Sequence, residues 1–232
     1  GKLGEGTTLP SLREVVHIFC TSEDINNLAY ALTIKAATEQ VWLPSIRALL
    51  DRLRGLAEAG AAIPMLAHTH GQPATPVTIG KEMAVFAHRL SRQIKRVEAT
   101  EYLGKINGAT GTWAAHVVSV PGADWPTLAR SFVEGLGLTW NPLTTQIESH
   151  DWQAELYSDV ARAGRIAHNL ATDAWTYISM DYFHQNLAAQ GSTGSSTMPH
   201  KVNPIRFENA EANLEVSNAL LDSLGATLVT SR

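Results

Sequence analysis

The stretch IGKEMAVFAHRLSRQIKRV, residues 79–97, decides the fold class of this chain. Its apolar residues recur at intervals of three and four, which places them along one face of an α-helix. The stretch therefore predicts a helix of about five turns that buries this face. The face comprises Ile79, Met83, Phe86, Leu90, Ile94 and Val97.

A second helical segment opens with TSED at residues 21–24 and continues to about Gly60. Thr21 and Asp24 have the spacing of a capping box, and acidic residues in a first turn interact favourably with the helix dipole. Pro44 lies inside the segment and predicts a kink or a break, because proline lacks the backbone N–H that a helix interior needs.

Two more segments show helical periodicity, one from about Trp152 to Tyr177 and one from Asn203-Pro204 through Leu224. Such lengths exceed the average helix of about 11–12 residues. They are typical of bundles whose helices pack over many turns, often against other chains. The predicted fold class is all-α, a bundle of long helices, with at most a short strand near residues 117–120.

Composition excludes several classes of protein. The 232 residues are 44% hydrophobic, enough for one substantial core or two small ones. A formal charge of −4 argues against a nucleic-acid binder, since such domains usually carry a basic excess. The single cysteine, Cys20, excludes an internal disulfide framework, and no apolar run approaches the length of a membrane span. We therefore expect a cytoplasmic protein.

The segment HTHGQPATP, residues 68–76, places two histidines before a Gly/Pro turn and a new helix. A histidine here could act as a general acid or base, because its ordinary pKa lies near neutrality. A polar surface loop explains the same residues. A zinc site is the weakest interpretation, since the i, i+2 spacing lacks a helical i, i+4 pair and no cysteine or acidic ligand lies nearby.

Two polar segments at helix beginnings have both a structural and a ligand-binding interpretation. Capping explains Thr21, Ser22 and Asp24, but it leaves the paired Asn26 and Asn27 unexplained. A carboxylate ligand would also suit this helix N-terminus, because free N–H groups and the helix dipole favour anions. In TTQIESHD, residues 144–151, Gln146 could bind a ligand, although a role in capping is favoured.

The segment GSSTMPHKVNP, residues 194–204, begins like a flexible linker but ends with residues that a linker does not require. It contains no G-x-S-x-G nucleophile elbow and no S-x-x-K motif. The chain also lacks the G-x-x-x-x-G-K-[ST] phosphate-binding loop, so neither a serine hydrolase nor use of ATP is supported.

These segments together resemble one enzyme superfamily. The pattern G-S-S-x-M-P-x-K-x-N-P is filled completely by residues 194–204 and resembles the signature loop of the fumarase/aspartase superfamily of fumarate-releasing lyases. Residues 69–74, THGQPA, resemble its adenylosuccinate lyase family, and residues 21–27 and 198–203 resemble the bacterial branch. The resemblance extends from about Val16 to Arg232.

The resemblance implies a C–N lyase of purine biosynthesis that splits adenylosuccinate into AMP and fumarate, and the ribotide SAICAR into AICAR and fumarate. It implies neither a metal nor an organic cofactor, and no nucleic-acid or membrane partner. It also implies that the chain belongs to the central helical domain, which forms a multi-helix core in a homotetramer with active sites shared between chains.

Site residues follow from the same resemblance. Ser195 matches the general base that removes a proton from the substrate, and His70 matches the general acid that protonates the departing nitrogen. The residues that match substrate-binding positions are Thr21, Ser22, Thr69, Gln146, Ser196, Met198, Lys201 and Asn203.

Some features depart from the family pattern or leave alternatives. His68 stands where many relatives have arginine, and residues 190–193 form a slightly longer stretch. We expect residues 1–232 to be a central domain without the N- and C-terminal domains, with residues 1–20 the tail of the connection from the former. The alternatives are another lyase of the superfamily, such as an argininosuccinate lyase-like enzyme, or an inactive helical oligomerisation core.

Overall fold

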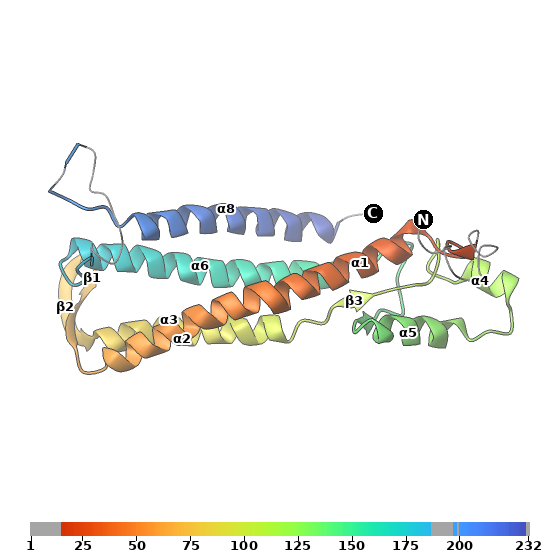
Figure 1. Cartoon of the computed structure of the whole chain (residues 1–232), viewed down its shortest axis with the longest axis horizontal. Helices are drawn as coiled ribbons and strands as arrows, with labels where there is room; N and C mark the ends of the chain where they lie inside the picture. Colours follow the sequence, from red (N-terminus) through yellow and green to blue (C-terminus); the bar gives the residue numbers. More distant parts are fainter. Residues whose placement is uncertain (1–14, 187–196, 199, 231–232) are drawn as a thin grey trace, which may run out of the picture. The chain divides into compact units, whose positions relative to one another are not determined.

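The computed structural model describes residues 15–186, 197–198 and 200–230 (Figure 1). Contacts within the chain divide it into two compact units. Unit 1 contains the described residues of the ranges 15–41, 101–153 and 228–230, and unit 2 contains those of the ranges 42–100 and 154–227.

Unit 1 is built around a long helix and a pair of two-residue parallel strands. The Thr139 N–H donates to the carbonyl oxygen of Tyr102, and the Asn141 N–H donates to that of Gly104, which joins these strands. The core of the unit contains Leu28, Tyr102 and Val133, each at most 8% exposed. The elements are α1 (Ser22–Ala37), β3 (Leu103–Gly104), α4 (Ala114–Ser119), α5 (Trp125–Gly135) and β4 (Thr139–Trp140).

A five-residue π-helix, η3 (Thr38–Trp42), separates α1 from α2 (Leu43–Ala59). Pro44 lies in the first turn of α2, where a missing N–H costs little. Its ring would clash with the carbonyl four residues earlier in a continuous α-helix, and a wider π turn relieves that clash. The kink or break predicted at Pro44 takes the form of this π segment, and the helical run continues through it into α2.

Unit 2 contains long helices and one β-hairpin. The strands β1 (Pro64–Thr69) and β2 (Gln72–Thr78) pair antiparallel in the connection between α2 and α3. The helices are α2, α3 (Ile79–Glu98), the part of α6 (Asp151–Ser179) from residue 154 onward, and α8 (Ile205–Leu228).

Helix α3 confirms the prediction from residues 79–97. Five of the six residues on the predicted face are at most 5% exposed, with Leu90 fully buried. The helix packs closely against α2, because a side chain on Gly80 would lie only 2.3 Å from the carbonyl oxygen of Ala57. Glycine is therefore required where the two helices approach.

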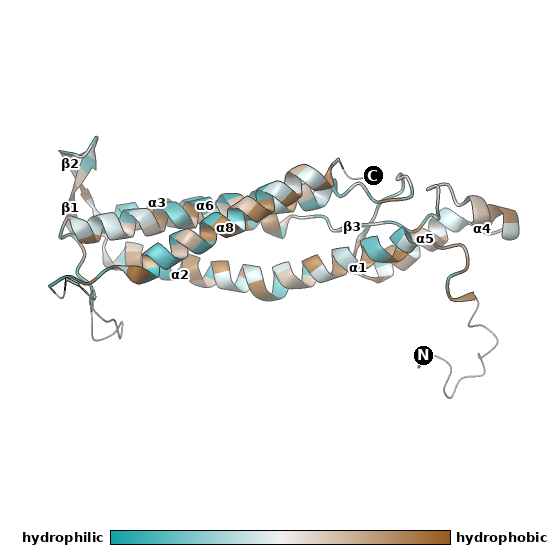
Figure 2. Ribbon diagram, turned by 90° about the horizontal axis from the view of Figure 1, so that it is seen from above, coloured by the Kyte–Doolittle hydropathy of each residue, from teal (hydrophilic) through white to brown (hydrophobic). Residues whose placement is uncertain are grey.

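Helices α6 and α8 also form where the sequence predicts them, but they bury very different shares of their surface. Trp152, Leu156 and Ile166 on α6 are at most 5% exposed. On α8 the buried residue is Asn218, whereas Val216, Leu220 and Leu224 are 63%, 60% and 46% exposed. Figure 2 shows hydrophobic residues along α8, and these exposed fractions mean that several of them do not pack against other described residues.

Three elements differ from the sequence-based expectations. The strand expected near residues 117–120 is wrong, because α4 covers most of that range. Helix α5 is not among the helices that the sequence analysis predicted: Asp124 caps it and Pro126 lies in its first turn. The β1/β2 hairpin was also missed, because Pro73 and Pro76 argue against a strand; a two-stranded sheet tolerates them since both its strands are edges.

No helix in the part of the chain that the structure describes is long and apolar enough to cross a membrane.

Candidate active site

The N-terminus of α1 forms the best-defined polar cluster of unit 1. Thr21 is the N-cap residue and is 8% exposed, and its N–H donates to Oδ2 of Asp24 at 2.9 Å. The Gln146 amide donates to Oγ1 of Thr21 at 2.9 Å, although the two residues lie 125 positions apart. Two residues predicted to bind substrate are therefore in contact, while Ser22 beside them is exposed.

A buried ion pair lies directly beneath this helix N-terminus. The Lys105 ammonium is 2.8 Å from Oδ1 of Asp24, and both side chains are fully buried. The Asp24 carboxylate also accepts hydrogen bonds from the backbone N–H groups of Asn107 and Gly108. Asp24 thus caps α1 and also fixes the 105–108 segment against it. Sequence analysis identified only the cap, because no local pattern links Asp24 to a lysine 81 positions away.

The structure shows a role for Asn27, one of the two asparagines that capping does not explain. Its amide donates to the carbonyl oxygen of Lys105 at 3.0 Å and accepts from the N–H of Lys105 at 2.9 Å. This buried side chain therefore satisfies both backbone groups of one residue, as a neighbouring strand would. Asn26 is exposed and bonds Glu23 on its own helix. The structure thus gives Asn27 a structural function that does not require a ligand.

A cleft of about 730 Å³ lies beside this cluster, within the usual size range of small-molecule sites. Gln146 lines it, and the same amide reaches Thr21. Thr144 belongs to the wall and accepts a hydrogen bond from the Asn107 amide at 2.7 Å, which connects the wall to the segment fixed by Asp24. The lining residues are Leu143, Thr144, Thr145, Gln146, Ile147, Ser149 and Val229.

His116 is a buried titratable residue that sequence analysis did not identify. It is 5% exposed, and its ring lies 5.1 Å from that of Phe19 and 4.8 Å from that of Trp125. Its Nδ1 atom has no hydrogen-bond partner among the residues that the structure describes. Burial lowers the pKa of His116, and the nearby Asp24 carboxylate opposes this effect in part. The imidazole is therefore kept neutral in a largely aromatic environment.

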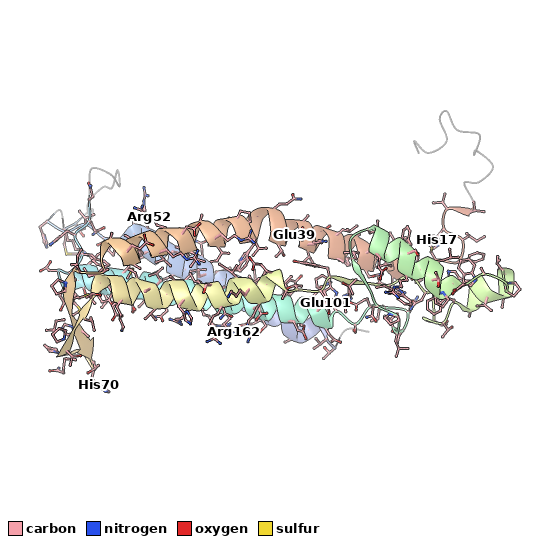
Figure 3. All side chains as sticks on the ribbon, turned by 90° about the horizontal axis from the view of Figure 1, so that it is seen from below. His17, Glu39, Arg52, His70, Glu101 and Arg162 are labelled. Atoms are coloured by element: carbon pink, nitrogen blue, oxygen red, sulfur yellow. The ribbon has the colours of Figure 1, made fainter. Side chains whose placement is uncertain are left out.

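Thr69 and His70 lie at the tip of the hairpin in unit 2. Thr69 pairs with Gln72, so His70 and Gly71 are the two turn residues, and both have positive φ values of 53° and 71°. Such backbone is typical of a tight hairpin turn, and histidine is among the non-glycine residues enriched there. The side chains of Thr69 and His70 are exposed. Figure 3 shows His70 at the end of the hairpin, directed away from the helices of its unit.

The described part of the signature segment leads into α8. The N–H of Lys201 donates to the carbonyl oxygen of Met198 at 3.2 Å, which forms a turn. Lys201 is exposed and Asn203 is partly buried just before the helix begins at Ile205. The proposed base, Ser195, and its neighbour Ser196 lie outside the described residues.

The predicted site residues thus fall into two sets. Thr21, Ser22 and Gln146 belong to unit 1, whereas residues 69–70 and 198–203 belong to unit 2. Among the residues that the structure describes, no group of three or more histidine, cysteine, aspartate or glutamate side chains is arranged to hold a metal ion.

Comparison with known proteins identifies the family. A family profile described as "Lyase" matches residues 2–216. The chain belongs to this lyase family.

Curated relatives of this lyase chain are named adenylosuccinate lyase. The protein from Escherichia coli strain K12 is 51% identical over 231 residues, and that from Haemophilus influenzae is 48% identical over 231 residues. The protein from Vibrio cholerae is 50% identical over 225 residues, or 97% of the chain. The lyase chain spans about half the length of these relatives, 50%, 50% and 49% respectively.

Solved structures agree on the fold of the lyase chain. The 3-carboxy-cis,cis-muconate lactonizing enzyme from Pseudomonas putida matches with a TM-score of 0.74 and 25% identity, covering 95% of this chain and 48% of that one. A fumarate lyase from Mesorhizobium sp. BNC1 matches with a TM-score of 0.73 and 23% identity over 92% of this chain and 46% of that one, which supports the helical architecture alone.

Proposed function

We propose that the protein containing this chain is an adenylosuccinate lyase, which splits adenylosuccinate into AMP and fumarate and SAICAR into AICAR and fumarate. The observation that carries the proposal is the identity of about 50% to adenylosuccinate lyases over the full chain. The motifs THGQPA at residues 69–74 and GSSTMPHKVNP at residues 194–204 lie within the matched region.

The chemistry requires two positioned groups. A weakly acidic proton beside a carboxylate must be removed, and the amine must then be protonated as it leaves. In the proposed mechanism Ser195 removes the proton and His70 protonates the departing nitrogen. Serine is a weak base, so the Lys201 ammonium and backbone N–H groups would favour its ionised form. The exposure of His70 on a hairpin supports this role, because the imidazole can reach a ligand that docks against the hairpin.

The carboxylates of the substrate need stabilisation while negative charge spreads onto them. Thr21 and Ser22 stand at the N-terminus of α1, and Lys201 and Asn203 precede that of α8. Free N–H groups and the helix dipole favour anions at both places. In the same proposal Gln146 binds substrate from the cleft, and Thr69, Ser196 and Met198 complete the site. No metal or organic cofactor enters any step.

The proposed active protein is a homotetramer whose active sites combine residues from different chains. Exposed apolar residues on α8, at positions 216, 220 and 224, recur once per turn and support packing against further helices. The chain itself is the proposed central domain of a longer cytoplasmic enzyme. An Asp in place of Leu220 would introduce a charge into that packing, so L220D is expected to lower the mass of the assembly measured by light scattering.

The test is direct. The purified full-length protein is incubated with adenylosuccinate, and AMP and fumarate are measured separately. Release of both in equal amounts is expected. Release of fumarate from argininosuccinate but not from adenylosuccinate would instead identify another lyase of the superfamily. A full-length protein that binds none of these substrates would identify a helical oligomerisation core, and near-wild-type turnover by Ser195→Ala would contradict the assignment of the base.

A further inference from the structure

A short segment of unit 2, residues 182–185, follows α6 and contacts two parts of the proposed site that are distant in sequence. We call it the bridge segment. It lies at the end of the unit where the hairpin and the start of α8 are also found (Figures 1 and 2). None of its residues has a role in the proposed reaction.

The first contact is with the hairpin. The Tyr182 hydroxyl donates to the carbonyl oxygen of Leu66 on β1 at 3.0 Å. The strand pairing is irregular between Leu66 and His68, so this carbonyl lies where the β ladder is disturbed. The His68 ring is 5.9 Å from that of Tyr182, and its Nδ1 is 3.1 Å from the same carbonyl oxygen. Two side chains therefore converge on one backbone group, three residues before the strand ends at Thr69.

The second contact is with the segment that leads into α8. The Gln185 amide donates to the carbonyl oxygen of Val202 at 2.7 Å. Val202 stands between Lys201 and Asn203, the two residues proposed to bind the substrate carboxylate. A hydrogen bond at this carbonyl fixes the backbone of the residue between them.

The bridge segment is itself attached to α6. The N–H groups of Tyr182 and Phe183 both donate to the carbonyl oxygen of Tyr177. The Tyr177 ring lies 6.3 Å from that of Tyr182 and 5.3 Å from that of Phe183. Asp181 between them adopts a positive φ of 60°, which turns the chain out of the helix. The contacts to the hairpin and to Val202 thus start from a well-packed helix end.

We propose that Tyr182 and Gln185 are positioning residues: Tyr182 positions the hairpin that carries His70, and Gln185 positions the backbone of Val202, between Lys201 and Asn203. This inference rests on the proposed function. It gives the two residues separable effects. In the proposed reaction His70 acts in the chemical step, whereas Lys201 and Asn203 bind a carboxylate of the substrate and also stabilise the charge that develops in the transition state.

The kinetic test uses Tyr182→Phe and Gln185→Met in the full-length protein, each of which removes one hydrogen-bond donor with little change in shape. Loss of such a bond is worth about a 3- to 10-fold effect. We expect Y182F to lower kcat by that factor with KM unchanged. Q185M is expected to raise KM by that factor and to lower kcat as well, because Lys201 and Asn203 act both in binding and in the chemical step. Tyr157→Phe, on α6 in the same unit, is the matched control and is expected to change neither.

Hydrogen–deuterium exchange provides a readout that does not depend on turnover. Y182F is expected to speed exchange in residues 64–78 only, and Q185M in residues 200–206 only. Wild-type protein without lyase activity would refute the proposed function, and exchange equal to that of Y157F would then refute the positioning as well. If the wild type is active, two outcomes overturn the inference: both variants have the kinetics of Y157F, or the two variants change kcat and KM in the same way.

Discussion

The N-terminus of α1 and the tip of the β1/β2 hairpin carry predicted site residues in opposite environments. At α1, Thr21 is 8% exposed and bonds both Asp24 and Gln146. At the hairpin tip, Thr69 and His70 are exposed, and the Tyr182 hydroxyl holds the hairpin through a hydrogen bond to the carbonyl oxygen of Leu66. The Thr21 cluster is hydrogen-bonded within its own unit, whereas Thr69 and His70 are exposed.

The difference in burial between the two regions decides how each can bind a ligand. A buried and hydrogen-bonded cluster is preorganised and can bind a ligand group without further ordering. An exposed histidine on a turn gains a defined environment only when a substrate or another chain docks against it. Substitutions in the two regions should therefore separate stability from catalysis.

The largest expected effect is at the hairpin tip. His70→Ala should lower kcat by roughly 10²–10⁴, the usual contribution of a general acid, while the midpoint of thermal unfolding stays within error of wild type. His70→Asn tolerates the positive φ and should show the same loss, which separates the chemistry from the turn geometry. Steady-state kinetics and calorimetry on the same samples check both statements, and a loss confined to the alanine variant would assign the effect to the turn.

The next effect concerns stability and belongs to α1. Asp24→Ala leaves the Lys105 ammonium buried without its partner, so we expect the free energy of unfolding to fall by about 3–5 kcal/mol. Glu98→Ala removes one side of the exposed pair with Arg47 and should cost at most about 1 kcal/mol, although that pair is the shorter of the two at 2.6 Å. Urea unfolding measures the free energy of unfolding of both variants. Equal losses would show that burial does not decide how much an ion pair contributes to stability.

A smaller effect is expected from the cap itself. Thr21→Val keeps the shape of the side chain but removes the oxygen that accepts from Gln146, and we expect a loss of about 1 kcal/mol in stability. Because the same hydroxyl is proposed to bind a substrate carboxylate, KM should rise in parallel. Unfolding and kinetic measurements on T21V check this, and an unchanged KM would confine Thr21 to a structural role.

The smallest effect is a dependence on pH that comes from His116. Its pKa is lowered in the folded state by burial, from an ordinary value of 6.5. The unfolded chain therefore takes up this proton first as the pH falls, so stability is full above about pH 6.5 and decreases toward the lower folded pKa. Denaturation between pH 8 and pH 5 should show this fall, and His116→Phe should reduce it. An identical slope in H116F would remove His116 as the cause.

Local sequence patterns predicted the helices well because helix formation depends on neighbouring residues. The face from Met83 to Val97 is buried, the helix is irregular directly before Pro44, and α6 lies close to its expected ends. Helix α5 could have been found from Asp124 and Pro126, an N-cap followed by proline in the first turn. The hairpin was harder to predict, because its prolines are tolerated only at edge strands and the sheet in the described part of the chain has two strands, both of them edges.

Motif resemblance named the site residues, but it did not describe their surroundings. Asp24 looked like a simple cap, and its pairing with Lys105 depends on a chain reversal that no local pattern encodes. The same holds for the Thr21–Gln146 contact, for the aromatic environment of His116, and for the bond from Gln185 to Val202.

The sequence by itself determined the all-α class and the family, and it predicted the site residues, because spacing and motif are local properties of the chain. Only the tertiary structure decided which of those residues are buried, which are exposed and which bond one another. The physical reason is that burial and long-range hydrogen bonds arise when distant segments meet. Asn27 shows the division: its sequence context suggested a ligand, and the fold instead placed the backbone of Lys105 against its amide.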